Sequence, residues 1–207
     1  MKRKIIVFAG FILMTLIFSM FRCGCKPYNY SLDSIDAGLK RITGTHINTV
    51  YNYPYYALED IYSQDDTVAI AFDSLAIEVW TKYSTVYAFN RNLPGIQSAY
   101  ATSIRIIYEK ITDIIITSNK DYSAEYPSGS NLKGLISVIH SLDMAAMTVD
   151  NMIEMFSLYD GWQWDYSLLY TFNTPPDTEE VHDITIIYKT EKNQEFTAVV
   201  KNVKILK

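Results

Sequence analysis

The chain contains few of the residues that build covalent or metal-centred sites. It has two cysteines and three histidines among 207 residues. Both cysteines, Cys23 and Cys25, lie near the start, so the rest of the sequence can form neither a disulfide nor a thiol nucleophile. The histidines, His46, His140 and His182, are far apart, and none has a second histidine or cysteine at the spacing of a zinc site. We therefore expect no metal and no cofactor, and interpret each histidine as a surface or hydrogen-bonded side chain.

Catalytic signatures are also missing from the sequence. It contains no His-Glu-x-x-His, no Gly-x-Ser-x-Gly and no glycine-rich phosphate loop. Carboxylates are the remaining candidates, because a glycosidase needs two of them about 5 to 9.5 Å apart. Asp60, Asp65 and Asp66 cluster in one polar stretch, and Asp160 and Asp165 flank a tryptophan pair. We interpret these residues as solvated surface groups and predict no catalytic residue and no enzymatic activity.

Positive charge is scarce beyond the first residues. Four of the 18 basic residues, Lys2, Arg3, Lys4 and Arg22, lie at the start, which leaves 14 basic against 23 acidic residues and a net charge of −9. A domain this acidic repels the phosphates of nucleic acids and anionic lipids. We therefore expect no nucleic-acid partner and no basic membrane-binding patch.

The first residues have the pattern of an export signal. A basic run precedes seventeen uncharged residues, 5–21, and Arg22 ends the run. A signal peptide has an apolar core of about 7 to 15 residues, whereas a spanning helix needs roughly 20. We predict a signal peptide over residues 1–22. An uncleaved signal anchor is the alternative.

The two cysteines follow this run directly, as in bacterial lipoproteins, whose signal ends at a cysteine that becomes lipidated. Cys23 has the apolar Met20 three residues before it, whereas Cys25 has Arg22 there but follows the small Gly24. We predict lipidation at Cys23, with Cys25 as the alternative, and ordinary cleavage without lipidation as a further one. Residues 23–33 would be a lipid-anchored tether, and the membrane would be a partner through that anchor.

Alternating apolar residues indicate strands in most of the remaining chain. The strongest pattern covers residues 67–83, where the alternation changes parity near Asp73 and predicts a bulge or bend. Residues 109–118 form another strand, whose continuous run at 114–116 predicts burial on both faces. Residues 164–173 and 181–190 are also predicted strands. A four-residue turn at 191–194 then leads to strands over 195–200 and 203–206.

Other segments are less regular. We predict a strand near 39–44 and a loop over 58–66, and Pro54 makes the aromatic stretch 51–56 an unsuitable central strand. Residues 131–139 have apolar side chains at helical spacing and predict a short helix. Thr148 is a suitable N-cap for a second helix over 149–158.

Seven or so short strands without βα alternation predict a mainly β fold. We expect an immunoglobulin-like β-sandwich with one or two short inserted helices, formed as a single domain by residues 34–207 and preceded by the signal segment.

An aromatic group suggests a binding surface. Trp162, Trp164 and Tyr166 lie at a period of two, so they share one face if they form a strand. Facing outward, they would form a stacking platform for a sugar ring or a partner protein. Facing inward, they would belong to the core, which the sandwich interpretation favours.

A family resemblance rests on the strand over 67–80 around Phe72-Asp73, on the closing hairpin and on three motifs: Ile-Thr-Asp-Ile-Ile-Ile-Thr-Ser at 111–118, Tyr-Pro-Ser-Gly at 126–129 and Tyr-Thr-Phe-Asn-Thr-Pro-Pro at 170–176. Together with the leader and its cysteines, they make the chain resemble a Bacteroidetes family of lipoproteins of unknown function. The resemblance implies an extracytoplasmic, membrane-anchored position in the bacterial cell envelope, with the outer membrane favoured. We expect a non-enzymatic structural or interaction module, whose partner is an envelope protein or a glycan. The alternative is a glycan-binding surface lipoprotein that uses the aromatic group.

Overall fold

The computed structural model of the chain describes residues 28–48, 53–61, 66–85, 105–107, 110–140, 146–158 and 167–207. The predicted signal segment, residues 1–22, lies outside these ranges.

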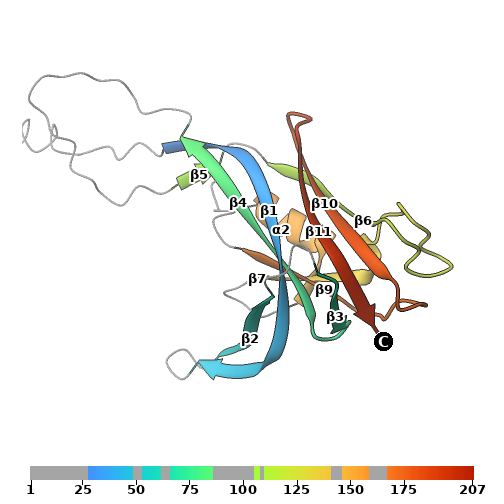
Figure 1. Cartoon of the computed structure of the whole chain (residues 1–207). Coiled ribbons are helices and arrows are strands. Elements are labelled where there is room, and N and C mark those ends of the chain that lie inside the picture. The colour runs from blue at the N-terminus through green and yellow to red at the C-terminus, as the bar shows by residue number, and fades with distance from the viewer. Residues whose placement is uncertain are drawn as a thin grey trace, which may run out of the picture.

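Two β-sheets make up most of the described structure (Figure 1). The larger sheet has seven described strands in the order β2-β1-β4-β9-β7-β8, with β5 paired to β1, and the smaller has four in the order β3-β11-β10-β6. The strands of the larger sheet are β1 (Tyr28–Asn48), β2 (Tyr53–Ile61), β4 (Leu75–Thr85), β5 (Arg105–Ile107), β7 (Ile136–His140), β8 (Ala146–Thr148) and β9 (Leu168–Phe172). Those of the smaller sheet are β3 (Val68–Ala71), β6 (Ile111–Ser118), β10 (Val181–Thr190) and β11 (Glu195–Leu206).

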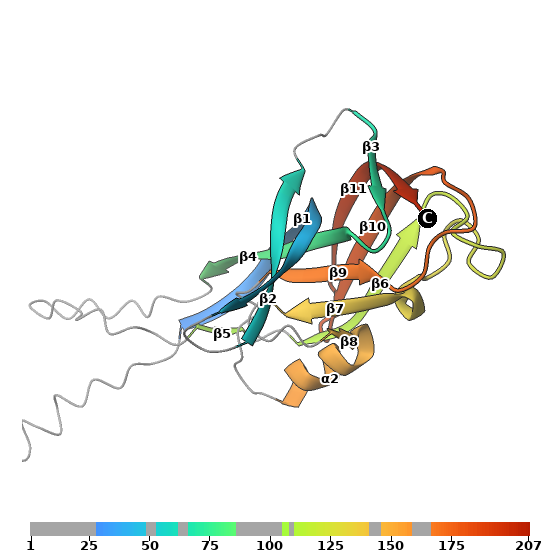
Figure 2. The same ribbon diagram turned by 90° about the horizontal axis from the view of Figure 1, so that it is seen from below.

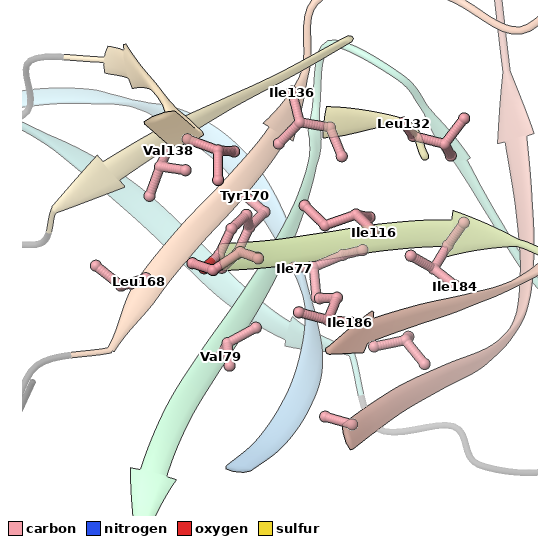
Figure 3. Close-up of a cluster of buried hydrophobic side chains, with 14 of the residues drawn as sticks. Ile77, Val79, Ile116, Leu132, Ile136, Val138, Leu168, Tyr170, Ile184 and Ile186 are labelled. Atoms are coloured by element: carbon pink, nitrogen blue, oxygen red, sulfur yellow. The ribbon is translucent and has the colours of Figure 1, made fainter. Parts of the chain in front are cut away.

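The core lies between the two sheets. Along β10, Ile184, Ile186 and Tyr188 are buried while the residues between them are half-buried, as a period of two requires. Ile77 and Val79 of β4 enter the same core from the larger sheet, and Figure 3 shows side chains of both sheets meeting. The predicted mainly β sandwich is therefore confirmed, and its immunoglobulin-like connectivity stays a prediction.

The parity change near Asp73 corresponds to a turn that moves the chain between the sheets. The N–H of Ser74 donates to the carbonyl of Ala71 at 3.0 Å, which closes a turn between β3 and β4. β3 pairs in parallel with β11 of the smaller sheet, and β4 pairs with β1 and β9 of the larger one. The predicted bend thus connects the two layers.

A ten-residue helix, α2 (Val149–Leu158), closes one side of the sandwich. It lies against β6 of the smaller sheet and β7 and β8 of the larger (Figure 2), and buries Val149 and Met152 completely. The N–H of Asn151 donates to Oγ1 of Thr148 at 3.2 Å, so the predicted N-cap and helix are confirmed.

The helix predicted over residues 131–139 is wrong. This segment forms a short 3-10 helix, η1 (Lys133–Leu135), followed by strand β7. The buried positions Leu132, Ile136 and Val138 fit helical spacing only in part, and the β-branched residues after Gly134 favour an extended chain. Asn131 fixes the turn, because its Oδ1 accepts from the N–H groups of Ile116 and Lys133 at 3.2 and 3.1 Å.

Two further boundaries differ from the prediction. β1 begins at Tyr28, so residues 28–33 of the expected tether belong to the sheet, and Leu32 is buried against the core. Residues 58–61 of the expected loop belong to β2, which pairs with β1. β2 is an edge strand in which Leu58, Glu59 and Asp60 are exposed, which explains why a polar sequence containing Pro54 can form it. The strand predicted near 39–44 lies within β1.

The end of the chain also differs in detail. The four-residue turn at 191–194 is confirmed, but the two strands predicted after it are one, β11, which contains a bulge opposite Asp183. Asn202 occupies the bulge with a φ of 58°, and its N–H donates to Oδ1 of Asp183 at 2.9 Å.

The predicted burial of 114–116 on both faces is wrong for Ile115, which is half-buried because the outer face of this sheet is open.

We predict that Thr148→Ala lowers the free energy of unfolding by about 1 kcal/mol, because the helix loses its N-cap acceptor. Thr148→Ser should retain most of the stability. Thr174→Ala is the matched control: Thr174 lies in an exposed loop and contributes its backbone carbonyl to the fold. Urea denaturation of the three variants measures this, and equal stability of Thr148→Ala and Thr174→Ala would refute the capping role.

Candidate functional site

The site residues predicted from the sequence lie outside the described residues. These are the lipidation candidates Cys23 and Cys25 and the aromatic group Trp162, Trp164 and Tyr166. The predictions of a lipid anchor and of an aromatic binding platform at these positions therefore stay predictions.

The described surface contains another aromatic candidate, Trp80. It lies on β4 with 37% of its surface exposed, whereas its neighbour Val79 points into the core and is 1% exposed. Glu78 and Lys82 lie two positions away on the same strand and therefore share the outer face of the larger sheet, the face turned away from the smaller sheet. Trp80 is the one tryptophan among the described residues.

The Trp80 ring lies over Gly38 of the neighbouring strand β1. A Cβ atom built on Gly38 would be 3.1 Å from both Cη2 and Cζ3 of the ring. The missing side chain thus lets the six-membered ring approach the backbone of β1 closely. Asp36, which pairs directly with Trp80 in the ladder, lies on the same face. Gly38 therefore positions the ring against the sheet.

Ion pairs flank the ring. Lys82 pairs with Asp36, and both side chains are well exposed, at 60% and 45%. On the other side, Lys40 pairs with Glu78 at 2.8 Å and also with Asp60 of β2. Burial lowers the pKa of Lys40, but its bonds to Asp60 and Glu78 outweigh this effect and raise the pKa overall. These contacts bind three adjacent strands together across the outer face.

Sequence reasoning missed Trp80, although a signal was present. Within residues 67–83 the odd positions from Leu75 to Val79 are apolar, so the even positions Glu78, Trp80 and Lys82 must face outward. A core tryptophan rarely shares its strand face with charged residues on both sides, so this pattern indicates an exposed ring. Its support by Gly38 depends on strand pairing, which the sequence does not show.

His182 is the one described histidine whose side chain can be placed. It is fully buried, and its Nδ1 lies 2.8 Å from Oγ of Ser118 on the neighbouring strand β6. Ser118 also accepts from the N–H of Lys120 at 3.0 Å, and Tyr122 lies beside the imidazole with ring centroids 6.0 Å apart. The expectation of a hydrogen-bonded histidine is confirmed here. His46 and His140 lie on β1 and β7.

The Ser118–His182 pair is part of the buried core. Both residues are sealed from solvent, at 3% and 0% exposed. Nε2 of His182 has no hydrogen-bond partner among the described residues, so no carboxylate of the described chain orients the ring as in a Ser-His-Asp triad. Burial lowers the pKa of His182, Glu180 partly opposes this shift, and Lys120 adds to it. The imidazole is therefore neutral at pH 7 and contributes to the core.

The loop that follows β6 and the corner at residues 170–176 meet at one end of the sandwich. The ring of Tyr122 stacks on Phe172 with centroids 5.2 Å apart, and its hydroxyl donates to the carbonyl of Thr174 at 2.6 Å. Asp177 accepts from the N–H of Ala124 at 2.9 Å. The loop after β6 and the Pro-Pro corner after β9 therefore support each other as one ordered structure.

The acidic residues weighed for catalysis are only partly described. Asp60 is exposed on β2 and Asp66 is exposed just before β3, whereas Asp65, Asp160 and Asp165 lie outside the described residues. Where the structure describes the chain, no group of three histidine, cysteine, aspartate or glutamate side chains is arranged to hold a metal ion.

No family model, curated protein or solved structure matches the chain. In the described ranges, no helix has the length and apolar character that crossing a membrane requires.

We predict that acid destabilises the fold through His182. In the unfolded chain the pKa of His182 is near 6.5, whereas burial lowers it in the folded chain. The free energy of unfolding therefore keeps its full value above pH 6.5 and falls as the pH drops toward the lowered pKa. Urea unfolding at about pH 8 and about pH 5 should therefore show a smaller loss for His182→Gln than for the wild type. An equal loss in both proteins would show that other groups cause the acid sensitivity.

Proposed function

We propose that the chain is a lipid-anchored protein of the bacterial cell envelope, in which an immunoglobulin-like β-sandwich acts as a non-enzymatic structural or interaction module. The observation that carries the interaction role is Trp80, an exposed aromatic side chain supported by Gly38 and flanked by ion pairs on a rigid sheet. An exposed aromatic ring offers a flat apolar surface on which a ligand or a partner can stack.

The buried polar groups favour a structural rather than a catalytic use of the interior. The hydroxyls of Tyr170 and Tyr188 bond to each other at 2.6 Å, and Ser118 bonds to His182, all within the core. Groups that are sealed and engaged in this way cannot contact a substrate. The accessible chemistry of the described chain therefore lies on its outer faces.

A short distance between anchor and domain fits the envelope role. β1 begins at Tyr28, five residues after Cys23, and an extended chain spans at most about 3.6 Å per residue. A lipidated Cys23 would therefore hold the start of β1 within about 18 Å of the membrane surface. The domain would be held at the membrane by its acyl chains, which fits its excess of acidic residues.

The alternative is a glycan-binding surface lipoprotein. It would use Trp162, Trp164 and Tyr166 as a stacking surface, and the exposed ring of Trp80 is a further aromatic surface that favours it.

The anchor is tested by labelling cells with palmitate and measuring the intact mass of the mature protein, for the wild type, Cys23→Ala and Cys25→Ala. We expect label in the wild type, no label in Cys23→Ala, and retained label in Cys25→Ala, which is the matched control. Loss of label only in Cys25→Ala would move the anchor to that residue. A wild-type protein without label would contradict the lipid anchor.

A further inference from the structure

Building on the interaction role proposed above, we propose that the outer face of β1 and β4 binds a pyranose ring of a glycan, stacked on Trp80. We call this surface the Trp80 platform. It consists of Trp80, the underlying Gly38, and the flanking charged residues Asp36, Lys82 and Glu78.

The first argument is the shape of the aromatic surface. Because Gly38 has no side chain, the ring lies close to β1, and a Cβ atom there would come within 3.1 Å of two ring carbons. Trp80 nevertheless keeps 37% of its surface exposed. One apolar face of a pyranose carries only C–H groups, and such a face stacks well on a flat indole ring.

The second argument is the position of the polar groups. Hydroxyls surround the rim of a pyranose, so a sugar site needs donors and acceptors beside its aromatic ring. Asp36 and Lys82 supply both kinds, and their side chains are 45% and 60% exposed. A carboxylate accepts several hydrogen bonds and an ammonium group donates three, so both retain capacity after pairing with each other.

The third argument is charge, which selects a neutral ligand. Asp36 is paired with Lys82, and Glu78 is paired with Lys40. A cationic ligand would compete with these lysines for the carboxylates, whereas the hydroxyls of a neutral sugar can join the existing pairs. The platform therefore fits a neutral glycan better than an arginine-rich peptide, although a tryptophan ring can stack on either.

The fourth argument concerns the surroundings of Trp80. Protein hot spots are typically clustered anchors in a patch that excludes water. The other large exposed apolar side chains of the described chain are Leu58 on β2 and Val181 and Val199 on the smaller sheet. None of them lies on β1 or β4, so Trp80 is the one large exposed apolar side chain described on these two strands, and its neighbours Asp36, Glu78 and Lys82 are charged. This arrangement is poor for a protein interface and adequate for one sugar ring.

Tryptophan fluorescence can report on this platform alone. The chain has three tryptophans, so a Trp162→Phe, Trp164→Phe double variant leaves Trp80 as the single indole. We titrate the full chain with cellohexaose, maltoheptaose and chitohexaose in turn. We expect at least one of these neutral oligosaccharides to quench or shift the emission of the double variant, with saturation at millimolar concentration.

Variants of the platform provide the controls. Trp80→Ala should weaken binding by about tenfold or more in calorimetric titration, because the stacking surface is lost. Gly38→Ala keeps the indole but places a methyl group 3.1 Å from two ring carbons, so the ring must shift by a few tenths of an ångström, and binding should weaken. Val199→Ala, on the outer face of the smaller sheet, is the matched control and should bind as the wild type does. Circular dichroism verifies that each variant is folded.

The outcomes separate this inference from the proposed function. If no oligosaccharide changes the emission of the double variant, the platform does not bind glycans, while the palmitate label still decides the lipid anchor independently. Binding that survives Trp80→Ala but is lost in the double variant would place the glycan at Trp162 and Trp164, and would overturn the Trp80 platform. Binding of a poly-arginine peptide without any oligosaccharide would replace the neutral glycan by a cationic partner.

Discussion

A buried hydrogen bond between two tyrosines joins the two layers of the sandwich. The hydroxyl of Tyr170 on β9 lies 2.6 Å from that of Tyr188 on β10, and both side chains are almost completely buried. Burial raises the pKa of both phenols, so both are neutral at pH 7. A buried hydroxyl that loses its partner costs about 1 to 3 kcal/mol. Sheet arrangements that separate these two residues are therefore disfavoured, and the bond selects one packing among those that would bury similar apolar area.

The rest of the structure supports this packing from its margins. α2 fills the side between β6 and β7, and Lys133 pairs with Asp113 of β6 and Asp150 of α2 at 3.1 and 2.8 Å. Asn131 and the residues around it cover the open edge of β6, since Leu132 donates its N–H to the carbonyl of Ile116 at 2.7 Å. An edge covered in this way cannot pair with another chain.

The sequence predicted the parts of the fold that local patterns determine. Strand β10 has the predicted bounds, and the turn after it and the cap at Thr148 follow from residue types within a few positions. The helix expected at 131–139 failed because its short apolar pattern fits a turn and a strand equally well, and only packing decides between them. The edge strand β2 was missed because a half-exposed strand can be polar.

Prediction of the site was limited by contacts between distant residues. The parity of β4 shows that Trp80 faces outward, but the contact between its ring and Gly38 exists only because β1 pairs with β4. The bond between Ser118 and His182 and that between Tyr170 and Tyr188 also depend on pairing and on the packing of layers. Such contacts have no signal in the spacing of residues along one strand. The platform and the buried pairs therefore became visible only in the folded chain.

The most direct test of the central claim is a double-mutant cycle between the two buried tyrosines. The free energies of unfolding of the wild type, Tyr170→Phe, Tyr188→Phe and the double variant are measured in urea at neutral pH. If the hydroxyl pair joins the layers, the double variant should lose less stability than the sum of the single losses, with a coupling of about 1 kcal/mol or more. Losses that add to within about 0.3 kcal/mol would contradict the account, because the two hydroxyls would then contribute independently of each other.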